Sequence, residues 1–142
     1  MFTSANAVGA ETGGRDALTQ TLSRPFFVAM LEREVVRADE TGKAFTLCVA
    51  DVDDLKRVNA RSGFRAGDAV VVAVADSIRG RLRAPGWRDV PSAVARYDGD
   101  AVAAMLRHAE RERVHELASG IADDIARAEF RGSKGVKVSI AA

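Results

Sequence analysis

Asp51 and Asp53 are the residues of this sequence best suited to bind a metal ion. They lie at the end of a continuous apolar run, Phe45–Val52, that is typical of a buried strand. Because side chains alternate along a strand, both carboxylates should lie on one side, with the main-chain carbonyl of Val52 between them. Two carboxylates and a carbonyl offer only oxygen ligands, which suit Mg²⁺. The alternative is that acids at a strand end simply cap the helix that follows.

Asp100 is a further candidate, and it lies in a stretch, AVARYDGDAVAAML at 93–106, that is typical of a β-hairpin. Asp98-Gly99 separates two apolar runs, and a two-residue Asp-Gly loop predicts a type I′ turn with positive φ at both residues. Tyr97 and Asp100 should then face each other across the turn. The carboxylate of Asp100 could serve either the turn itself or a site beside it.

The segment 15–41 is predicted to be a helix with one face on the core. Ser23 is expected to cap it, Pro25 suits its first turn, and Gly42 ends it. Two sets of residues recur at helical spacing: an apolar face of Phe27, Met30, Leu31 and Val35, and an opposite, solvated face of Glu32, Arg33, Glu34 and Arg37.

The remaining segments predict three helices and a strand. A short helix over 55–60 is broken near Gly63, and Asp68 should cap a helix over 68–83 in spite of its valine run, which by itself favours a strand. A third helix covers about 109–128, and residues 134–142 alternate as a half-buried strand. With strands at 45–52, 92–97 and 100–106, the chain is α/β, with its helices on a central sheet.

Length and composition limit the classes of function. The 142 residues, 47% of them apolar, suit one domain, and a net charge of +1 gives no general attraction for nucleic acid or anionic membranes. The single cysteine, Cys48, excludes an internal disulfide and suits a reducing compartment. With no signal peptide or membrane span, we expect a cytoplasmic protein unless the chain was cut from a longer membrane-attached one. Residues 1–14 are expected to form a flexible lead-in. His108 and His115 lack the further donors that zinc needs, and Arg79, Arg81, Arg83 and Arg88 are expected to be solvated.

Several motifs in order make residues 16–142 resemble the GGDEF domain, the diguanylate cyclase family that condenses two GTP molecules into cyclic di-GMP. DALT at 16–19, with Arg24, is similar to the family's DxLTxxxNR, and DVDDLKRVN at 51–59 to its DxDxFKxxND. Gly63 and Gly67-Asp68 match its GHxxGD, with Phe64 in place of histidine. RYDGDAV at 96–102 stands where RxGGDEF belongs, and VSIA at 138–141 where the last strand's SIG belongs.

The resemblance implies a nucleotide-cyclase-like fold, a mostly antiparallel sheet flanked by helices, with the signature on the hairpin. It also implies roles for individual residues. Asp51, the carbonyl of Val52 and Asp100 would hold Mg²⁺ against the triphosphate of GTP. Asn59 and Asp68 would recognise the guanine. The phosphates would be held by the main-chain amides after Asp53 and by an ammonium group, so this set comprises Asp53, Asp54, Leu55 and Lys56.

The signature departs from the family pattern at three positions, since it reads DGDAV in place of GGDEF. Asp98 places a negative charge where a glycine lets the nucleotide approach. Ala101 replaces a glutamate, and alanine can neither bind metal nor accept a proton. Val102 keeps only the packing role of the phenylalanine. These changes suggest lost turnover.

Two further departures concern regulation and the end of the chain. The window for the family's product-inhibition motif, RxxD, reads DVPS at 89–92, so no such site is expected. The family continues past its last motif with another helix and strand, which supply a lysine and an arginine to the phosphates, whereas this sequence ends at Ala142. Either the chain is a piece of a longer domain or the domain has lost these elements. In both cases we expect a domain over 15–142 that lacks them and exposes a sheet edge, which favours a partner chain or a homodimer.

Three functions are consistent with this sequence, besides a plain α/β module without a ligand. The first is an inactive GGDEF domain that acts as a regulatory or protein-interaction module in cyclic di-GMP signalling, with GTP and Mg²⁺ as retained ligands and a protein or domain of that pathway as its partner. The second is an active or weakly active diguanylate cyclase, because Asp51, Asp100, Lys56, Asn59 and Asp68 are all present. The third is a cyclic di-GMP receptor, which the missing RxxD disfavours.

Overall fold

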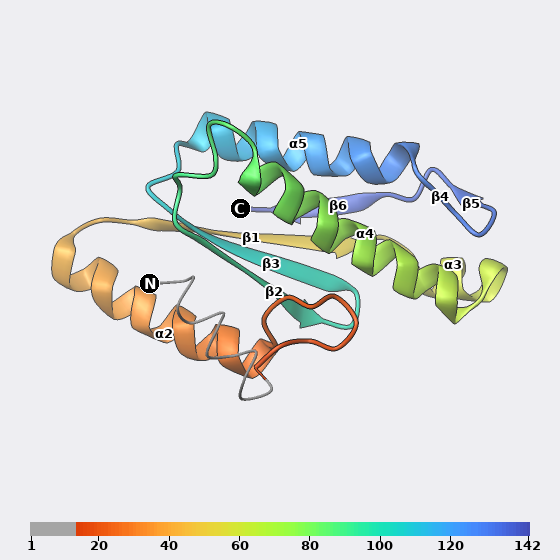
Figure 1. The fold of residues 1–142 in the computed structure, drawn as a ribbon, viewed down its shortest axis with the longest axis horizontal. Helices are drawn as coiled ribbons and strands as arrows, with labels where there is room; N and C mark the ends of the chain where they lie inside the picture. The colour runs from red at the N-terminus through yellow and green to blue at the C-terminus, as the bar shows by residue number, and fades with distance from the viewer. Residues whose placement is uncertain (1–13) are drawn as a thin grey trace.

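A four-stranded antiparallel sheet forms the centre of the protein (Figure 1). The computed structural model describes residues 14–142, so the predicted flexible segment lies almost wholly outside the described residues. The strand order is β2-β3-β1-β6. The strands are β1 (Phe45–Val52), β2 (Ser92–Asp98), β3 (Ala101–Arg107) and β6 (Val138–Ala141). The mostly antiparallel sheet that the family resemblance implies is thus confirmed.

Helices cover both faces of this sheet, as Figure 1 shows. Helix α2 (Arg24–Thr41) lies on one face, and helices α4 (Phe64–Arg83) and α5 (Arg111–Arg127) lie together on the other. Helix α3 (Leu55–Ser62) connects β1 to α4, and a small hairpin of β4 (Glu129–Phe130) and β5 (Ser133–Lys134) precedes β6. Within residues 14–142, no helix is both long and apolar enough to cross a bilayer.

Strand β3 is apolar from Ala101 to Leu106 because both of its faces are covered. Val102, Ala104 and Leu106 pack into the cluster beneath α4 and α5. Ala103 and Met105 point the other way, into the cluster beneath α2. A strand buried on both faces has no polar side to show, which explains the unbroken apolar run in the sequence.

Helix α2 begins at Arg24, later than the start at residue 15 that the sequence pattern predicts. Ser23 occupies the N-cap position as predicted, although its side chain makes no capping hydrogen bond, and Gly42 ends the helix with a φ of 69°. Residues 15–22 instead form a turn that is held to the edge of the sheet. The N–H of Leu22 donates to the carbonyl of Val94 (3.0 Å), and the carbonyl of Leu22 accepts from the N–H of Arg96 (3.0 Å). These bonds cover the outer edge of β2.

The buried side of α2 differs from the predicted one. Phe27, Met30 and Glu34 are buried, whereas Val35 and Val36 are 46% and 55% exposed. The prediction that Glu34 lies on a solvated face is therefore wrong. The buried face follows the spacing i, i+3, i+7, and a carboxylate can occupy it because two arginines neutralise it.

Glu34 joins α2 to the end of β3. Its two carboxylate oxygens accept hydrogen bonds from Arg37, one turn further along the helix, and from Arg107, all at 2.8 Å. Hydrogen bonds from Arg37 are the largest influence on the carboxyl group, and together with Arg107 they lower the pKa of Glu34 to about 2 in spite of its burial. This ion-paired group fixes the helix to the sheet.

Helix α4 starts four residues before the predicted position. It begins at Phe64, and Asp68 lies within it, exposed, rather than capping it. Gly63 makes this possible, because its φ of 86° lets the chain turn from α3 directly into α4. The helical interpretation of the valine run is confirmed.

The C-terminal strand is shorter than predicted, but its alternation is confirmed. Val136 is buried and Val138 and Ile140 are half-buried, whereas Lys137 and Ser139 are exposed. Only Val138–Ala141 pairs with β1. Part of the predicted strand is used for the β4–β5 hairpin, whose turn needs positive φ at two residues and gave no clear pattern in the sequence.

Candidate functional site

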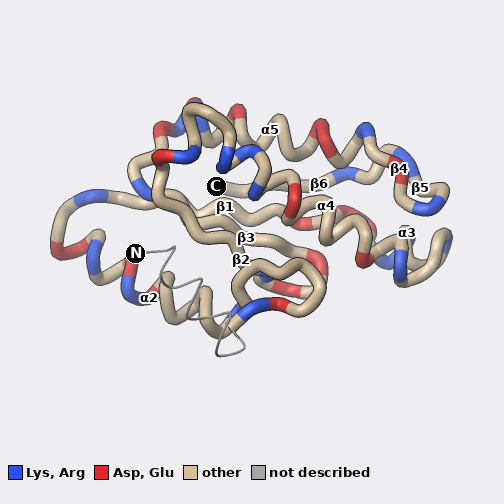
Figure 2. Tube along the Cα trace, viewed as in Figure 1, with Lys and Arg blue, Asp and Glu red and all other residues tan. Residues whose placement is uncertain are grey.

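Acidic residues gather where β1 ends and where the hairpin turns back, as Figure 2 shows. Asp51 lies at the centre of this cluster, opposite Ala101 in the register of β1 and β3. Partial desolvation is the largest cause that raises the pKa of Asp51 above its usual value, followed by the charges of Asp100, Asp53 and Asp98. Like charges held this close are unfavourable unless a cation neutralises them.

The hairpin loop has a different geometry from the predicted type I′ turn. Asp98 pairs with Ala101, so the two-residue loop is Gly99-Asp100, and an irregularity in the pairing lies between Arg96 and Asp98. Neither Asp98 nor Gly99 has a positive φ. Asp98 instead accepts the N–H of Gly99 on its own carboxylate (2.9 Å). The expectation that Tyr97 faces Asp100 across the turn is therefore wrong.

The carbonyl of Val52 faces the hairpin loop. The N–H of Val52 donates to the carbonyl of Asp100 (2.9 Å), and the N–H and carbonyl of one residue point to the same side of a strand. In residues 14–142, no group of three or more His, Cys, Asp or Glu side chains could hold a metal ion. The donors that remain are this carbonyl and the carboxylates of Asp51 and Asp100. All three are hard oxygen ligands, which bind Mg²⁺ together with oxygens of phosphate and water. The residues therefore fit the ion.

The alternative role of the acids, capping the next helix, is not what the structure shows. The N-cap residue of α3 is Asp54, and its side chain makes no capping hydrogen bond. The hydroxyl of Ser139 on β6 donates to the carboxylate of Asp53, whose two oxygens lie 2.7 and 2.9 Å from it. Asp51 and Asp53 are both exposed with buried Val52 between them, which agrees with the expected strand alternation.

The residues expected to hold phosphates lie at the start of α3. Asp54 adopts a left-handed conformation with a φ of 54°, which turns the chain sharply from β1 into the helix. The N–H groups of the first helical turn have no partner within the helix, and they carry partial positive charge. Leu55 is half-buried beneath them and Lys56 is exposed, beside the acidic cluster in sequence.

Asn59 is positioned by a glycine of the neighbouring helix. Its Oδ1 atom is buried without a hydrogen-bond partner in the described structure, and a methyl group added at Gly67 would overlap that atom. Asp68 follows Gly67 directly and is exposed. A buried amide oxygen without a partner is unfavourable, so a ligand N–H that reaches it would bring a net gain. The two residues expected to recognise guanine therefore lie next to each other, across the α3–α4 contact.

Replacing Gly67 with alanine tests this close packing. We expect Gly67→Ala to displace Asn59, lower the free energy of unfolding by about 1–3 kcal/mol through overpacking, and weaken GTP binding. Gly80→Ala is the matched control on the same helix, because a methyl group there meets open space. It should raise the free energy of unfolding by about 0.5–1 kcal/mol, as alanine favours a helix over glycine. Equal effects of both substitutions, measured by urea denaturation, would contradict the assignment.

Arg96 ties the hairpin loop to the turn that precedes α2, a contact that the sequence did not predict. Its guanidinium donates to the carbonyl of Gly99 (3.0 Å) and, more weakly, to the carboxylate of Asp16 (3.4 Å). The carboxylate of Asp16 also caps its own turn through the N–H and hydroxyl of Thr19, both at 2.8 Å. The position of the loop therefore depends on residues 80 apart in sequence.

The structure is a mixed α+β domain with a four-stranded antiparallel sheet flanked by helices, and the candidate site lies where β1, α3 and the hairpin meet. Residues 14–141 match the family "Diguanylate cyclase, GGDEF domain". The chain belongs to the GGDEF family.

Similar proteins agree with this assignment. The chain is 36% identical over 142 residues to the diguanylate cyclase TpbB of Pseudomonas aeruginosa, covering 94% of this chain and 29% of that protein. It is 25% identical over 127 residues to the diguanylate cyclase DosC of Escherichia coli, covering 89% and 26%. The chain thus spans little more than a quarter of the length of these relatives. The crystal structure of the DgcB GGDEF domain of Caulobacter crescentus in complex with c-di-GMP superposes with a TM-score of 0.75 at 28% identity, over 90% of this chain and 73% of that one.

Proposed function

We propose that this domain binds GTP with Mg²⁺, has lost the ability to condense it, and acts as a regulatory or protein-interaction module in cyclic di-GMP signalling. Binding is supported by Asp51 and Asp100, by the carbonyl of Val52 that faces them, and by Asn59 with its unpartnered oxygen. Asp68 and Lys56 lie beside these groups in the α3–α4 region. The similarity to diguanylate cyclases indicates cyclic di-GMP signalling as the pathway.

The proposed loss of turnover rests on one observation, the alanine at position 101. It stands where the family motif has glutamate, it pairs with Asp51 in the sheet, and it is only 5% exposed. A methyl group at this position can neither bind a second metal ion nor move a proton. Asp98 adds a negative charge next to the site that the triphosphate would approach. Losing one group that stabilises a transition state commonly costs about 10²- to 10³-fold in rate.

Incubating the purified protein with GTP and Mg²⁺ tests the proposal. We expect cyclic di-GMP production to be at least about 10²-fold slower than that of a GGDEF domain with an intact signature, measured in parallel. Production at a comparable rate would establish the second candidate, an active cyclase, which the retained metal and guanine residues favour.

We expect such a domain to act by binding a protein partner. The diguanylate cyclase SiaD of P. aeruginosa, which shares this fold with a TM-score of 0.77 at 24% identity, has been crystallised in complex with its activator SiaC. Known GGDEF structures also include complexes with c-di-GMP. For this chain we propose binding to a protein or domain of the same pathway, or to a second copy. Direct binding of cyclic di-GMP is a third candidate, which a calorimetric titration would detect.

A further inference from the structure

Helix α3 carries two arginines on the face opposite Asn59. Arg57 and Arg61 are four residues apart, about one helical turn, and so lie one above the other. Asn59 is two residues from each, which places it on the other side of the helix. The arginines therefore cannot belong to the guanine-recognising group between α3 and α4.

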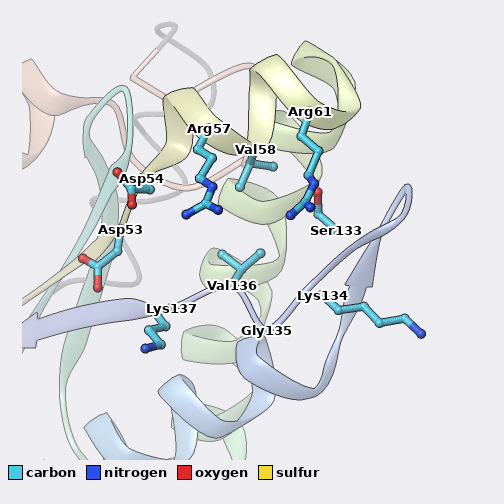
Figure 3. Close-up of a pocket in the computed structure, with 10 residues that line it drawn as sticks. All are labelled: Asp53, Asp54, Arg57, Val58, Arg61, Ser133, Lys134, Gly135, Val136 and Lys137. Atoms are coloured by element: carbon cyan, nitrogen blue, oxygen red, sulfur yellow. The ribbon is translucent and has the colours of Figure 1, made fainter.

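Both arginines line a pocket of about 350 Å³ between α3 and the chain that leads from β5 into β6 (Figure 3). Their guanidinium groups point toward Val136 and Gly135 in this view. This volume corresponds to roughly a dozen water molecules, which is enough for a diphosphate group. The complete lining is Asp53, Asp54, Arg57, Val58, Arg61, Ser133, Lys134, Gly135, Val136 and Lys137.

The walls of the pocket are held in place by contacts between distant parts of the chain. The hydroxyl groups of Ser62 and Ser133, 71 residues apart, are hydrogen-bonded at 2.7 Å. The N–H of Asp53 donates to the carbonyl of Lys137 (2.9 Å). Buried Val136 anchors the loop in the core between these two contacts. The two exposed arginines thus face a fixed wall on the other side of the pocket.

The two arginines of this pocket differ from several other arginines of the protein, because they form no ion pair within residues 14–142. Arg37, Arg79, Arg81, Arg96, Arg107 and Arg127 all form ion pairs with carboxylates. Neither Arg57 nor Arg61 is ion-paired to any residue in the described part of the chain. Lys137 also lines the pocket, at the end where Asp53 lies, and its side chain points away from the arginines in Figure 3.

The acidic residues of the lining leave the arginine end of the pocket positive. Asp53 and Asp54 lie together at the end away from Arg61 (Figure 3). The carboxylate of Asp53 is also engaged by the hydroxyl of Ser139. Lys134 points away from the pocket in Figure 3 and lies 4.0 Å from Glu129, so we assign it no role.

We propose that this pocket binds a phosphate-bearing anion through Arg57 and Arg61. Guanidinium groups bind phosphate oxygens through paired, charge-assisted hydrogen bonds, which makes a di- or triphosphate group the chemistry that fits best. The phosphate could come from a free anion or from the phosphate tail of a nucleotide held at the neighbouring site. The two arginines lie outside the metal and guanine groups, whereas Asp53 and Asp54 at the other end of the pocket belong to the set expected to hold the phosphates of GTP.

Calorimetric titration with pyrophosphate, without Mg²⁺, tests the pocket. The unmodified protein should bind one equivalent, and the double variant Arg57→Gln/Arg61→Gln should bind at least tenfold more weakly. Arg33→Gln/Lys43→Gln removes the same charge from exposed positions in and just after α2 and should leave the affinity unchanged. No binding by the unmodified protein, or equal weakening in both double variants, would overturn the proposal. Circular dichroism establishes that both variants are folded.

Two further arms separate this site from the nucleotide site. Asn59→Ala should leave pyrophosphate binding intact, and its loss would overturn the proposal, since the anion would then occupy the guanine side of α3. Repeating the titration on protein saturated with GTP and Mg²⁺ distinguishes the sources. If bound GTP weakens pyrophosphate binding and this effect depends on Arg57 and Arg61, the pocket takes the phosphate tail of the nucleotide. If pyrophosphate binds as tightly as before, the pocket takes a free anion. A protein that binds pyrophosphate but no GTP would refute the proposed function and leave the pocket standing.

Discussion

Replacing Glu34 with glutamine is expected to lower the free energy of unfolding by about 3 kcal/mol or more. Removing one partner of a buried ion pair commonly costs about 3–5 kcal/mol, because the remaining charges stay buried without compensation. Glu34 is only 2% exposed and binds two arginines, one from its own helix and one from the end of β3. Glutamine keeps the shape of the side chain but leaves Arg37 and Arg107 facing a neutral group.

Chemical denaturation at pH 7 measures this effect. Glu32→Gln is the matched control, because Glu32 is exposed on the same helix, and its effect should stay within about 0.5 kcal/mol. An unchanged midpoint for Glu34→Gln would mean that the ion-paired group does not hold α2 to the sheet.

The same residue predicts the behaviour of the protein in acid. A pKa lowered from 4.5 to about 2 corresponds to about 3 kcal/mol, at 1.36 kcal/mol for each tenfold change. Because the folded state lowers the pKa, this contribution is fully present above pH 4.5 and is lost as the pH falls toward 2. The unmodified protein should therefore lose stability through this range more steeply than Glu34→Gln. Parallel curves for the two proteins would contradict the pKa assignment.

The parts of the fold that depend on local pattern could be predicted from the sequence. The apolar run of β1 and the alternation around Val138 gave strands, and Gly42 gave a helix end, because each depends on neighbouring residues. The valine run of α4 was correctly assigned to a helix because the apolar stripe continues to Leu82. The placement of Asp51 and Asp53 on one side of the chain, with buried Val52 between them, follows from strand alternation in the same way.

The features that could not be predicted depend on contacts between distant residues. Glu34 is buried because Arg107, 73 residues further along the chain, reaches it. Nothing near Gly67 in sequence indicates that it abuts the side chain of Asn59, which another helix supplies. The Asp-Gly pair predicted a type I′ turn from local preference, but the pairing of Asp98 with Ala101 shifted the loop by one residue. The pocket of Arg57 and Arg61 needs the loop after β5 as its opposite wall.

Replacing Asp51 with asparagine is expected to abolish Mg²⁺-dependent GTP binding. Asp51 is the residue on which the charges of Asp100, Asp53 and Asp98 converge, and it carries one of the two carboxylates available to the ion. Without it, one carboxylate and a carbonyl would remain beside a neutral amide oxygen, so Mg²⁺ would be held far more weakly against the triphosphate.

The protein without ligand should not be destabilised by this substitution. The fold raises the pKa of Asp51, which means that its charged form is less favourable in the folded state than in the unfolded state. Asparagine removes that unfavourable charge, so the free energy of unfolding at pH 7 should stay the same or rise. A lost affinity together with unchanged or increased stability identifies a binding role rather than a structural one. A clear fall in stability would contradict this explanation of the raised pKa.

The central claim is tested most directly by titrating GTP into the unmodified protein and into Asp51→Asn, each with and without Mg²⁺. We predict that the unmodified protein binds GTP only when Mg²⁺ is present, and that Asp51→Asn does not bind under either condition. GTP binding that survives in Asp51→Asn, or that needs no Mg²⁺, would contradict a metal-dependent nucleotide site at the end of β1.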